Sequence, residues 1–397
     1  MHCSTNRVTD LLGDEGCILD LGELFARFAT VTDKRCARGK RYDLSTLLSI
    51  ATLAKLAGCQ HTAAIAAWAH LRRRALVRFF RLSRPSMPSL RTWNRVLGTA
   101  LDVQELEQKL AAYLGSILPR EPLDGYCCAA IDGKTLRGTI RVGHSGVHLM
   151  AIYLPAEGLV LAQTEIGAKA NEISAAPGVF AQVDLEGLVI TADAMFTQRH
   201  LCLQIVAGHG NYVLQVKENQ PRLLDDIKTL FAPQTPIQGS GLIPTDFATA
   251  TSKAKGHGRI ETRTITVSGM LQAYSDWPHL AQVFQIESHI VQRTTGQDTR
   301  SVRYGITSLS TEQIKPHQLL ALVRRHWGIE SGLHYRRDVI LGEDRCRVCT
   351  GEAPHVHAVL NNLIITLLHR RQAPSMAQSL RELSYQIERN LTLLDLP

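Results

Sequence analysis

Acidic residues at two strand-like positions are the first candidates for chemistry in this chain. The apolar run YCCAAID ends in Asp132, and the later apolar run LVITAD ends in Asp193. A hairpin and a helical pattern lie between them, and a crossover through a helix makes the two strands parallel neighbours. Two aspartates at one edge of a sheet repel each other, so we expect a cation to bind between them.

A third carboxylate is supplied by the helical pattern that starts at Lys315. One face of this helix carries, at helical spacing, Leu319, Val323, His326, Glu330 and Leu333. The face is mostly apolar or aromatic, so it is expected to pack against the sheet, where a carboxylate is costly unless it is paired or binds metal. We therefore favour Glu330 over the acids that follow it, which are Asp338, Glu343 and Asp344. Oxygen ligands of this kind suit Mg²⁺ or Mn²⁺.

Each acid also has a simpler interpretation. An aspartate at the end of a strand often caps a turn or a helix. Glu330 alone could form an ion pair with Arg325 or Arg337. The combination is more specific than any single acid, because three acids converge under one topology.

The elements that would position these acids divide the chain into five consecutive parts. Residues 1–120 are predicted to be a helical domain, and residues 121–217 the first part of an α/β core with buried strands. Residues 218–315 are Thr-rich and contain Pro and Gly, which indicates a β-rich insertion. Residues 316–375 are predicted to be the second part of the core, with the third acid, and residues 376–397 a helical tail.

The charge balance favours an acidic partner. The sequence has 44 Lys and Arg against 36 Asp and Glu, a net charge of +8, and nucleic acid is the commonest partner of such a protein. The pattern AAIAAWAHLRRRALVRFF predicts one basic helix with Arg72, Arg73 and Arg74, as in a helix-turn-helix domain. The alternatives are a basic enzyme kept soluble by its charge and a helical bundle with a solvated basic face.

The cysteines and the apolar runs bear on the compartment. Nine cysteines without framework spacing suit a reducing cytosol. The run VLNNLIITLL is too short to span a bilayer, and the start of the sequence has no apolar signal core. We expect a soluble, cytoplasmic protein with no membrane partner.

A series of motifs spread over nearly the whole chain resembles the DDE transposases of bacterial insertion sequences, in particular the ISAs-type, or H-repeat-associated, group. In order, these motifs are IDGKTLRG, KANEI, ITADAMFTQ, YVLQVKENQ, GHGRIETR, RRHWGIESGLHYRRDV and GEDRCR. The resemblance implies an α/β fold, a ribonuclease-H-like mixed sheet flanked by helices, with a β-rich insertion before the last catalytic residue. Asp132, Asp193 and Glu330 match the three catalytic, metal-binding acids of the family.

The implied activity is two-metal DNA cleavage and strand transfer at terminal inverted repeats. The implied partners are those repeats and target DNA, bound by a homodimer in the bacterial cytoplasm, at the nucleoid. Residues 1–120 would then bind the DNA end. Two alternatives share the fold: a metal-dependent nuclease without strand transfer, and a catalytically silent DNA-binding protein.

Basic residues in several motifs are expected to contact DNA, although each could instead lie in a solvated turn or face. They are Lys134, Lys253, Lys255, Arg259, Arg325 and Arg337, together with Arg72, Arg73 and Arg74. In the wider DDE class an arginine often precedes the glutamate by four residues and a lysine follows it by seven. His326 and Arg337 occupy those positions here.

Two motifs resemble ligand sites without meeting their spacing. A phosphate-binding loop needs a glycine five residues before its Gly-Lys pair, and Cys128 stands at that place before Gly133. No nucleotide cofactor is therefore expected. The segment CRVCTGEAPHVH has a good cysteine pair but poor histidine spacing for zinc, so we expect two half-buried thiols and the start of a helix.

Overall fold

The chain forms two compact units, each built from segments far apart in the sequence. The structure is a computed structural model that describes residues 21–117, 125–143, 145–167, 170–233, 245–256, 258–370 and 375–393. The first unit combines Met1–Arg120, Gly133–Asn171 and Glu330–Pro397, and the second combines Glu121–Asp132 and Glu172–Ile329. This division by packing differs from the five consecutive parts expected, because strand β1 (Cys127–Leu136) passes from the second unit into the first.

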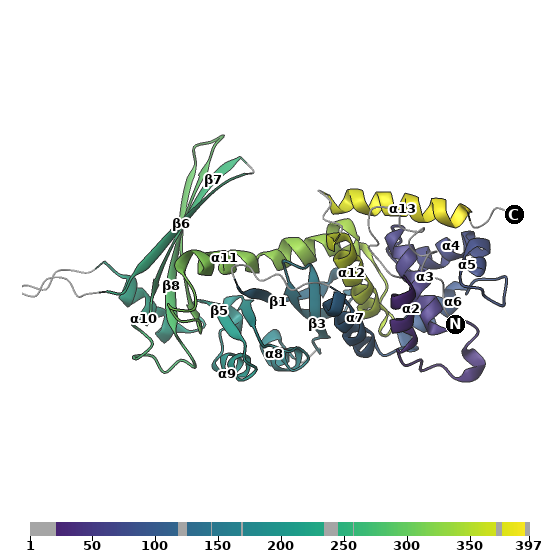
Figure 1. Cartoon of the computed structure of the whole chain (residues 1–397), viewed down its shortest axis with the longest axis horizontal. Helices are drawn as coiled ribbons and strands as arrows, with labels where there is room; N and C mark the ends of the chain where they lie inside the picture. Colours follow the sequence, from purple (N-terminus) through teal and green to yellow (C-terminus); the bar gives the residue numbers. More distant parts are fainter. Residues whose placement is uncertain are drawn as a thin grey trace, which may run out of the picture. The chain divides into compact units, whose positions relative to one another are not determined.

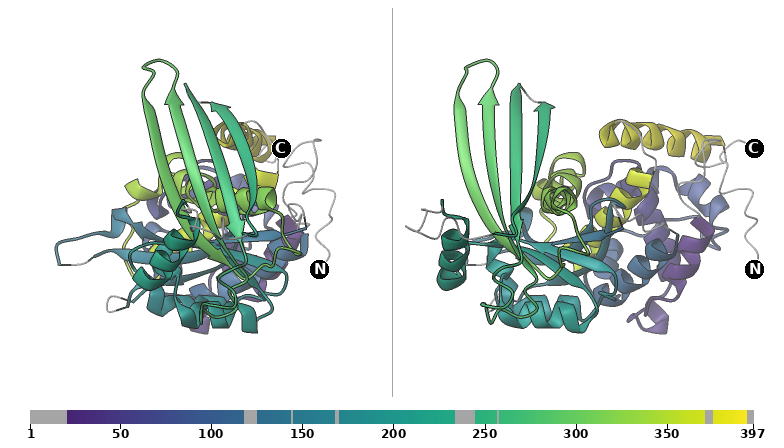
Figure 2. Two further views of the ribbon diagram at one scale, coloured as in Figure 1. Left: turned by 90° about the vertical axis from the view of Figure 1, so that its left-hand side faces the viewer. Right: turned by 60° about the vertical axis from the view of Figure 1, so that its left-hand side comes forward.

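The second unit is built on a mixed sheet with the strand order β1-β4-β5-β9-β8-β7-β6. β4 (Leu188–Ala192) is parallel to both β1 and β5 (Asn211–Val216). The remaining strands are antiparallel: β9 (Asp298–Thr307), β8 (Gln282–Gln292), β7 (Arg259–Ser268) and β6 (Ala248–Gly256). Figure 2 shows β6–β9 as long, neighbouring strands, which form the β-rich part expected before residue 315.

The described residues of the second unit include four α-helices: α8 (Glu172–Phe180), α9 (Arg199–Ala207), α10 (Pro221–Phe231) and α11 (Pro316–His326). α11 packs on β6 and β7. Its apolar residues Leu319, Leu320 and Leu322 are buried in a core that also contains Ile265 and Phe284 of the long strands. The apolar face predicted for this helix is therefore confirmed from Leu319 to His326.

The first unit is mainly helical. Its helices are α2 (Leu21–Ala29), α3 (Leu44–Leu56), α4 (Thr62–Leu71), α5 (Arg73–Phe79), α6 (Leu90–Thr99), α7 (Val103–Ile117), α12 (Ala353–Arg370) and α13 (Met376–Leu393). β2 (Val147–Leu154) and β3 (Leu159–Glu165) form the predicted hairpin, and the strand order is β3-β2-β1. α12 lies beside α7 and is buried along most of its length (Figure 1).

The predicted fold class is confirmed by this strand order. A hairpin precedes β1 in the order, and the parallel strands β4 and β5 follow it, as in a ribonuclease-H-like mixed sheet. β4 and β5 are buried almost throughout, as expected of parallel strands with both faces covered. The all-helical N-terminal region and the β-rich addition agree with the sequence as well.

The basic helix expected around Arg72 is two helices. α4 ends at Leu71 and α5 begins at Arg73, because the backbone of Arg72 leaves the helical region at φ −105° and ψ 21°. The Arg72 guanidinium stacks on Trp68, 4.9 Å from the ring centroid, and pairs with Glu388 of α13. The break therefore lies at a residue that joins α4 to α13.

A buried polar network holds distant segments of the first unit together. Arg337, whose side chain is 1% exposed, donates from Nε to Glu343 at 2.7 Å and from Nη1 to Gln163 of β3 at 2.9 Å. Asn361 of α12 donates to the other oxygen of Glu343 at 2.8 Å. Asn361 in turn accepts from Lys55 of α3 at 2.7 Å. Because removing one member leaves its partners buried and unpaired, this network is expected to be sensitive to single substitutions.

We predict that Arg337→Ala lowers the free energy of unfolding by about 3–5 kcal/mol, because the Glu343 carboxylate would remain buried without its cation. Equilibrium denaturant unfolding measures this change. Arg345→Ala, which removes an exposed arginine from the same segment, is the control and should change the stability by less than about 0.5 kcal/mol. A loss in Arg337→Ala no larger than in the control would contradict the structural role of the network.

His357 of α12 is a fully buried imidazole in the same unit. Its Nε2 lies 2.9 Å from the hydroxyl of Thr62 on α4. Burial, and then the nearby Lys55 and His61, lower the pKa of His357 well below its ordinary value of 6.5. The unfolded chain therefore takes up the proton first, so this contribution to stability is complete above pH 6.5 and is lost as the pH falls below it.

We predict that His357→Gln makes the free energy of unfolding less sensitive to acid. Between pH 6.5 and 5, the wild type should lose more stability than the variant, by up to about 1.4 kcal/mol per pH unit. Unfolding curves at matched ionic strength at pH 7.5, 6.5, 5.5 and 5 measure the difference. Parallel losses in the two proteins would show that His357 does not titrate as its burial requires.

Candidate active site

The register of β1 against β4 places Asp132 and Asp193 side by side. Ile131 pairs with Ala192, and the two aspartates are the next residues on these parallel strands. Hydrogen-bonded strands lie about 4.8 Å apart, so both carboxylates start within reach of one cation. The prediction that the two strands are parallel neighbours is thus confirmed.

The structure corrects the position of Asp132 within its strand. The sequence placed this residue at the strand end, but β1 continues to Leu136, and only its pairing with β4 stops at Ile131. Gly133, Lys134 and Thr135 therefore lie in a strand, which differs from a phosphate-binding loop before a helix. Asp132 is followed by more strand, so it does not cap a helix.

Asp193 does not match the simpler interpretation either. It precedes the short 3₁₀ helix η3 (Ala194–Phe196), yet its side chain makes no capping hydrogen bond to that helix. The carboxylate is about half exposed. A capping role would have directed its oxygens to the backbone N–H groups of η3.

His326, the last residue of α11, lies next to Asp193 in the second unit. Its Nε2 is 3.8 Å from Asp193 Oδ1, and its Nδ1 is 3.2 Å from the hydroxyl of Thr191. Burial lowers the pKa of His326, although Asp193 and Thr191 act in the opposite direction. A neutral imidazole leaves the negative charge of Asp193 available to a cation, whereas a permanently charged arginine at this position would compete for it.

Glu330 lies where the regular helix changes its form. α11 ends at His326, and the chain continues into two π-helical turns, η4 (Glu330–His334) and η5 (Arg336–Ile340). The expectation of one regular helical stripe through Leu333 is therefore corrected, since π turns advance the chain by a different angle per residue. Glu330 is more than half exposed and lies 3.6 Å from His334 Nδ1. Arg337, one expected partner of Glu330, pairs with Glu343 instead.

The donor chemistry of these residues fits Mg²⁺ or Mn²⁺. Asp132, Asp193 and Glu330 all supply carboxylate oxygens, which hard divalent cations prefer. Within the second unit the described donors at the end of β4 are two carboxylates and one neutral imidazole. This set lacks the thiolates that would favour a softer metal.

The basic residues predicted to contact DNA in the second unit lie on its surface or close to it. Lys253, Lys255 and Arg259 are exposed on the hairpin of β6 and β7, and Arg325 is half-buried on α11. His257, in the same sequence motif, lies outside the described residues.

The structure adds Arg303, which the sequence reasoning missed, to an aromatic and basic cluster that contains Trp327, Arg263 and Arg324. The guanidinium of Arg303 on β9 stacks over Trp327, 5.6 Å from the ring centroid, and Trp327 is 47% exposed. Burial lowers the pKa of Arg263 on β7, Glu261 opposes this, and the nearby Arg324 and Arg303 lower it further. The sequence signal was the recurrence of arginine along strands β7 and β9. Periodicity within one strand does not show that these arginines lie beside α11.

The remaining predicted contacts lie in the first unit, and three of them are already paired with acids. Lys134 is buried and donates to Asp338 at 2.6 Å, with Asp344 at 3.8 Å. Burial raises the pKa of Asp338 despite Lys134, and the adjacent acids Asp344 and Glu343 act in the same direction as burial. Arg337 differs from the expected surface contact, because it is enclosed in the network with Glu343 and Gln163. Arg73 and Arg74 are exposed, whereas Arg72 is paired with Glu388.

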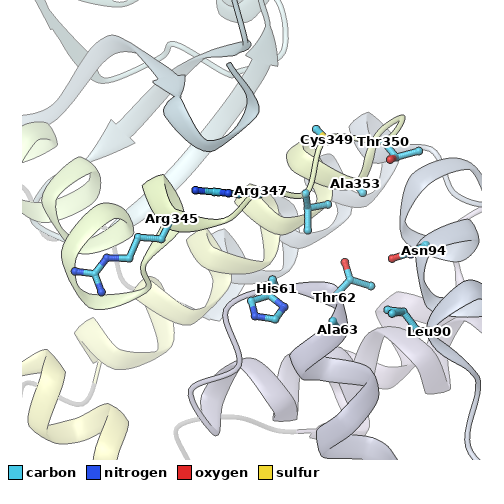
Figure 3. A pocket seen from close by; sticks show the side chains of 11 residues that line it. His61, Thr62, Ala63, Leu90, Asn94, Arg345, Arg347, Cys349, Thr350 and Ala353 are labelled. Carbon is cyan, nitrogen blue, oxygen red and sulfur yellow. The ribbon is translucent and has the colours of Figure 1, made fainter. Parts of the chain in front are cut away.

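A cavity of about 470 Å³ lies in the first unit between the start of α4 and the segment before α12. Figure 3 shows His61 and Thr62 on one side and Arg345, Arg347, Cys349 and Ala353 on the other. The two histidines of the zinc-like motif have other partners: His357 contacts Thr62, and His355 contacts Glu107 at 3.3 Å. Cys346 and Cys349 are half-buried thiols, and α12 begins at Ala353, in agreement with the sequence.

Comparison with known families identifies the domains to which these segments belong. The model of the transposase DDE domain matches residues 124–367, and that of the DDE_Tnp_1-associated domain matches residues 25–114. The chain belongs to the DDE transposase family. The family assignment made from the motifs is confirmed, including the H-repeat-associated group, whose members are among the relatives.

Three relatives illustrate the range of similarity. An uncharacterized protein in the dhlA 3' region of Xanthobacter autotrophicus is 32% identical over 69% of this DDE transposase chain and 90% of its own. The H repeat-associated putative transposase YhhI and the putative protein YbfL of Escherichia coli are each 29% identical over 60% of this chain. The match spans 63% of each of these two proteins.

One solved structure is similar at a low level. A piggyBac transposase synaptic complex with hairpin DNA matches with a TM-score of 0.42 and 11% identity, over 99% of this chain and 82% of that chain. Separately, no helix in the described ranges of the DDE transposase chain has the length and apolar character required to cross a membrane.

We predict that Asp193→Asn leaves the metal-free DDE transposase at least as stable as the wild type, because it removes the repulsion between neighbouring carboxylates. Mn²⁺ should raise the melting temperature of the wild type and should raise that of the variant much less. At a Mn²⁺ concentration of 100 times Kd, binding increases the free energy of unfolding by about 2.7 kcal/mol. Thermal unfolding with and without Mn²⁺ measures both effects. Glu312→Gln, an exposed acid of the same unit, is the control and should behave as the wild type. A destabilised metal-free variant would assign Asp193 a structural role.

Proposed function

We propose that this protein is an insertion-sequence transposase that cleaves DNA at terminal inverted repeats and joins the released end to target DNA. The single observation that carries the proposal is the register of β1 and β4, which brings Asp132 and Asp193 side by side in a chain of the DDE family. The buried, neutral His326 next to Asp193 supports a site prepared for a cation rather than one already neutralised.

In this proposal Asp132, Asp193 and Glu330 hold Mg²⁺ or Mn²⁺. Bound in pairs, such cations lower the pKa of water and stabilise both the attacking and the leaving oxygen of a phosphoryl transfer. The carboxylates themselves fix the reacting groups in position, and charge neutralisation with positioning is most of what phosphoryl transfer requires.

The chain path supports Glu330 as the third acid. His326 touches Asp193, and Glu330 follows it by four residues along a helical path, a rise of about 6 Å. The change to π-helical turns begins at Glu330, and such turns are frequent at functional sites.

We propose that Trp327 and Arg303 contact the DNA, since an exposed aromatic ring stacks on bases and an arginine neutralises phosphate. The exposed hairpin residues Lys253, Lys255 and Arg259 would hold the backbone farther out, and Arg325 of α11 lies two residues before Trp327. Arg73 and Arg74 are further proposed contacts in the first unit, and Lys134 would act only if its pair with Asp338 opens. Because two element ends are cut together, we propose a homodimer in the DNA complex.

The test is cleavage of a labelled duplex that carries the element's own end, with Mg²⁺ or Mn²⁺. Asp132→Ala, Asp193→Ala and Glu330→Ala should each bind the duplex as the wild type does. Each should lower the cleavage rate by roughly a hundredfold or more, since each removes part of an interaction of several kcal/mol in the transition state. Glu312→Ala serves as the control acid and should cleave normally.

The other outcomes separate the alternatives. Cleavage that survives one substitution would exclude that acid, and Glu343 or Asp344 would be examined next. Cleavage without joining in a target-joining assay would favour a metal-dependent nuclease. Binding without cleavage by the wild type would favour a catalytically silent DNA-binding protein.

A further inference from the structure

A second cavity of the first unit is lined by several arginines. In the sequence these arginines lie well before the three acids of the proposed active site. The volume of the cavity is about 410 Å³, and its described lining includes the arginines Arg35, Arg38, Arg41, Arg84 and Arg95. No aspartate or glutamate is among the described lining residues. We call this cavity the arginine pocket.

Hydrogen bonds fix the walls of the arginine pocket. The loop before α3 and the loop before α6 are joined where the hydroxyl of Tyr42 donates to the backbone carbonyl of Ser86 at 2.8 Å. The first loop is also tied to the end of α6, because Lys34 N–H donates to the carbonyl of Ala100 at 2.7 Å. The cavity is therefore formed by connected backbone segments rather than by long side chains alone.

Arg35 lines the pocket, and one of its three guanidinium nitrogens has no hydrogen-bond partner among the described residues. Its Nε and Nη2 donate to Asp33 at 2.9 and 2.8 Å, and Nη2 also donates to the carbonyl of Tyr42 at 2.8 Å. The side chain is 4% exposed, yet within the described structure Nη1 is buried without any hydrogen-bond partner. A buried N–H that lacks an acceptor costs free energy, so a ligand that supplies an acceptor at this position would be stabilised.

The charge of the other four arginines is not balanced by any carboxylate in the described part of the chain. Asp33 neutralises Arg35 and lies 3.7 Å from Lys40. Burial alone would raise the pKa of Asp33, but the hydrogen bonds and charges of Arg35 and Lys40 hold it below its ordinary value. Among the described residues, no carboxylate lies within ion-pair distance of the remaining arginines of the pocket, which are Arg38, Arg41, Arg84 and Arg95.

A helix end adds to this positive field. Ser89 caps the N-terminus of α6, and Ser89, Thr92 and Arg95 of this end all line the pocket. The positive end of a ten-residue helix favours an anion there. Gathered guanidinium groups repel one another unless an anion lies between them.

We infer that the arginine pocket binds a phosphate group of the DNA backbone. The planar guanidinium matches the spacing of phosphate oxygens and donates two parallel hydrogen bonds to them. The choice of DNA as the source of the phosphate rests on the proposed function, whereas the affinity for an anion rests on the pocket alone. Since phosphates carry no base sequence, the pocket positions the duplex and does not select the element end.

The test compares Arg84→Ala/Arg95→Ala with the control Arg91→Ala/Arg389→Ala. Each double variant removes two exposed arginines of the first unit, but only the first pair lines the pocket. Binding of a fluorescent duplex is measured by anisotropy over a range of salt concentrations, without divalent metal. The pocket variant should bind roughly tenfold more weakly than the control, and the slope of log K against log salt should fall by about 1. An element-end duplex and an unrelated duplex should lose the same factor.

A second measurement separates an anion site from a structural role. Sodium sulfate should raise the melting temperature of the control more than that of the pocket variant, at matched ionic strength. Without sulfate, the pocket variant should melt no lower than the control, because it relieves repulsion; a lower melting temperature would overturn the electrostatic basis of the inference.

Two further results would overturn the proposal. A loss of the sulfate effect with unchanged DNA affinity would assign the pocket to a different anion. Equal behaviour of the two variants in both assays would remove the site altogether. Since binding is measured without metal, failure of the wild type to cleave DNA would contradict the proposed function and would leave this result unaffected.

Discussion

The buried pairing of two parallel strands, which brings two carboxylates together, is the constraint on which the second unit depends. The buried pairing of Cys127–Ile131 with Leu188–Ala192 fixes the register of the two strands. A shift in this register would expose their apolar side chains. That register brings Asp132 and Asp193 together although they repel each other. α11, held by its apolar face, adds a neutral imidazole rather than a compensating cation. The folding energy of the sheet thus holds two carboxylates next to each other, an arrangement that a bound cation would stabilise.

Much of this could be read from the sequence, because short-range patterns determine it. Alternation between apolar runs and helical periods identified the strands and the crossover, and the crossover determined that β1 and β4 are parallel. The three acids were proposed for the same reason, since each follows or interrupts an apolar pattern where a charge is unexpected. The end of β1 was misplaced because pairing with β4 stops at Ile131, while the strand itself continues to Leu136. Periodicity describes one segment at a time and does not show where a partner strand ends.

The sequence patterns could not predict which basic residues are paired with acids in the folded chain. Lys134, Arg72 and Arg337 belong to motifs that suggest DNA contact, yet each has an acidic partner in the first unit, at Asp338, Glu388 and Glu343 respectively. These partners lie far away in the sequence for Lys134 and Arg72; for Arg337 the partner lies six residues later, at the start of a 3₁₀ helix that follows the π-helical turns. Only the folded chain shows which cations are already neutralised. The arginine pocket was missed for the converse reason, because its residues come from two loops and one helix end without any shared period.

Net charge alone therefore does not show which surface would bind DNA. The candidates are found by asking which cations have no acidic partner. An arginine with a carboxylate partner has already lost part of its hydration and gains little from a phosphate, because the acid must first be displaced. An arginine held near other cations gains more, since a phosphate also relieves their repulsion. By this criterion the arginine pocket, and Arg303 and Arg324 beside Trp327, are better candidates than Arg72, which is paired with Glu388, or Arg263, which is paired with Glu261. Of the surplus of eight positive charges, the ones that matter for binding are those that the fold leaves uncompensated.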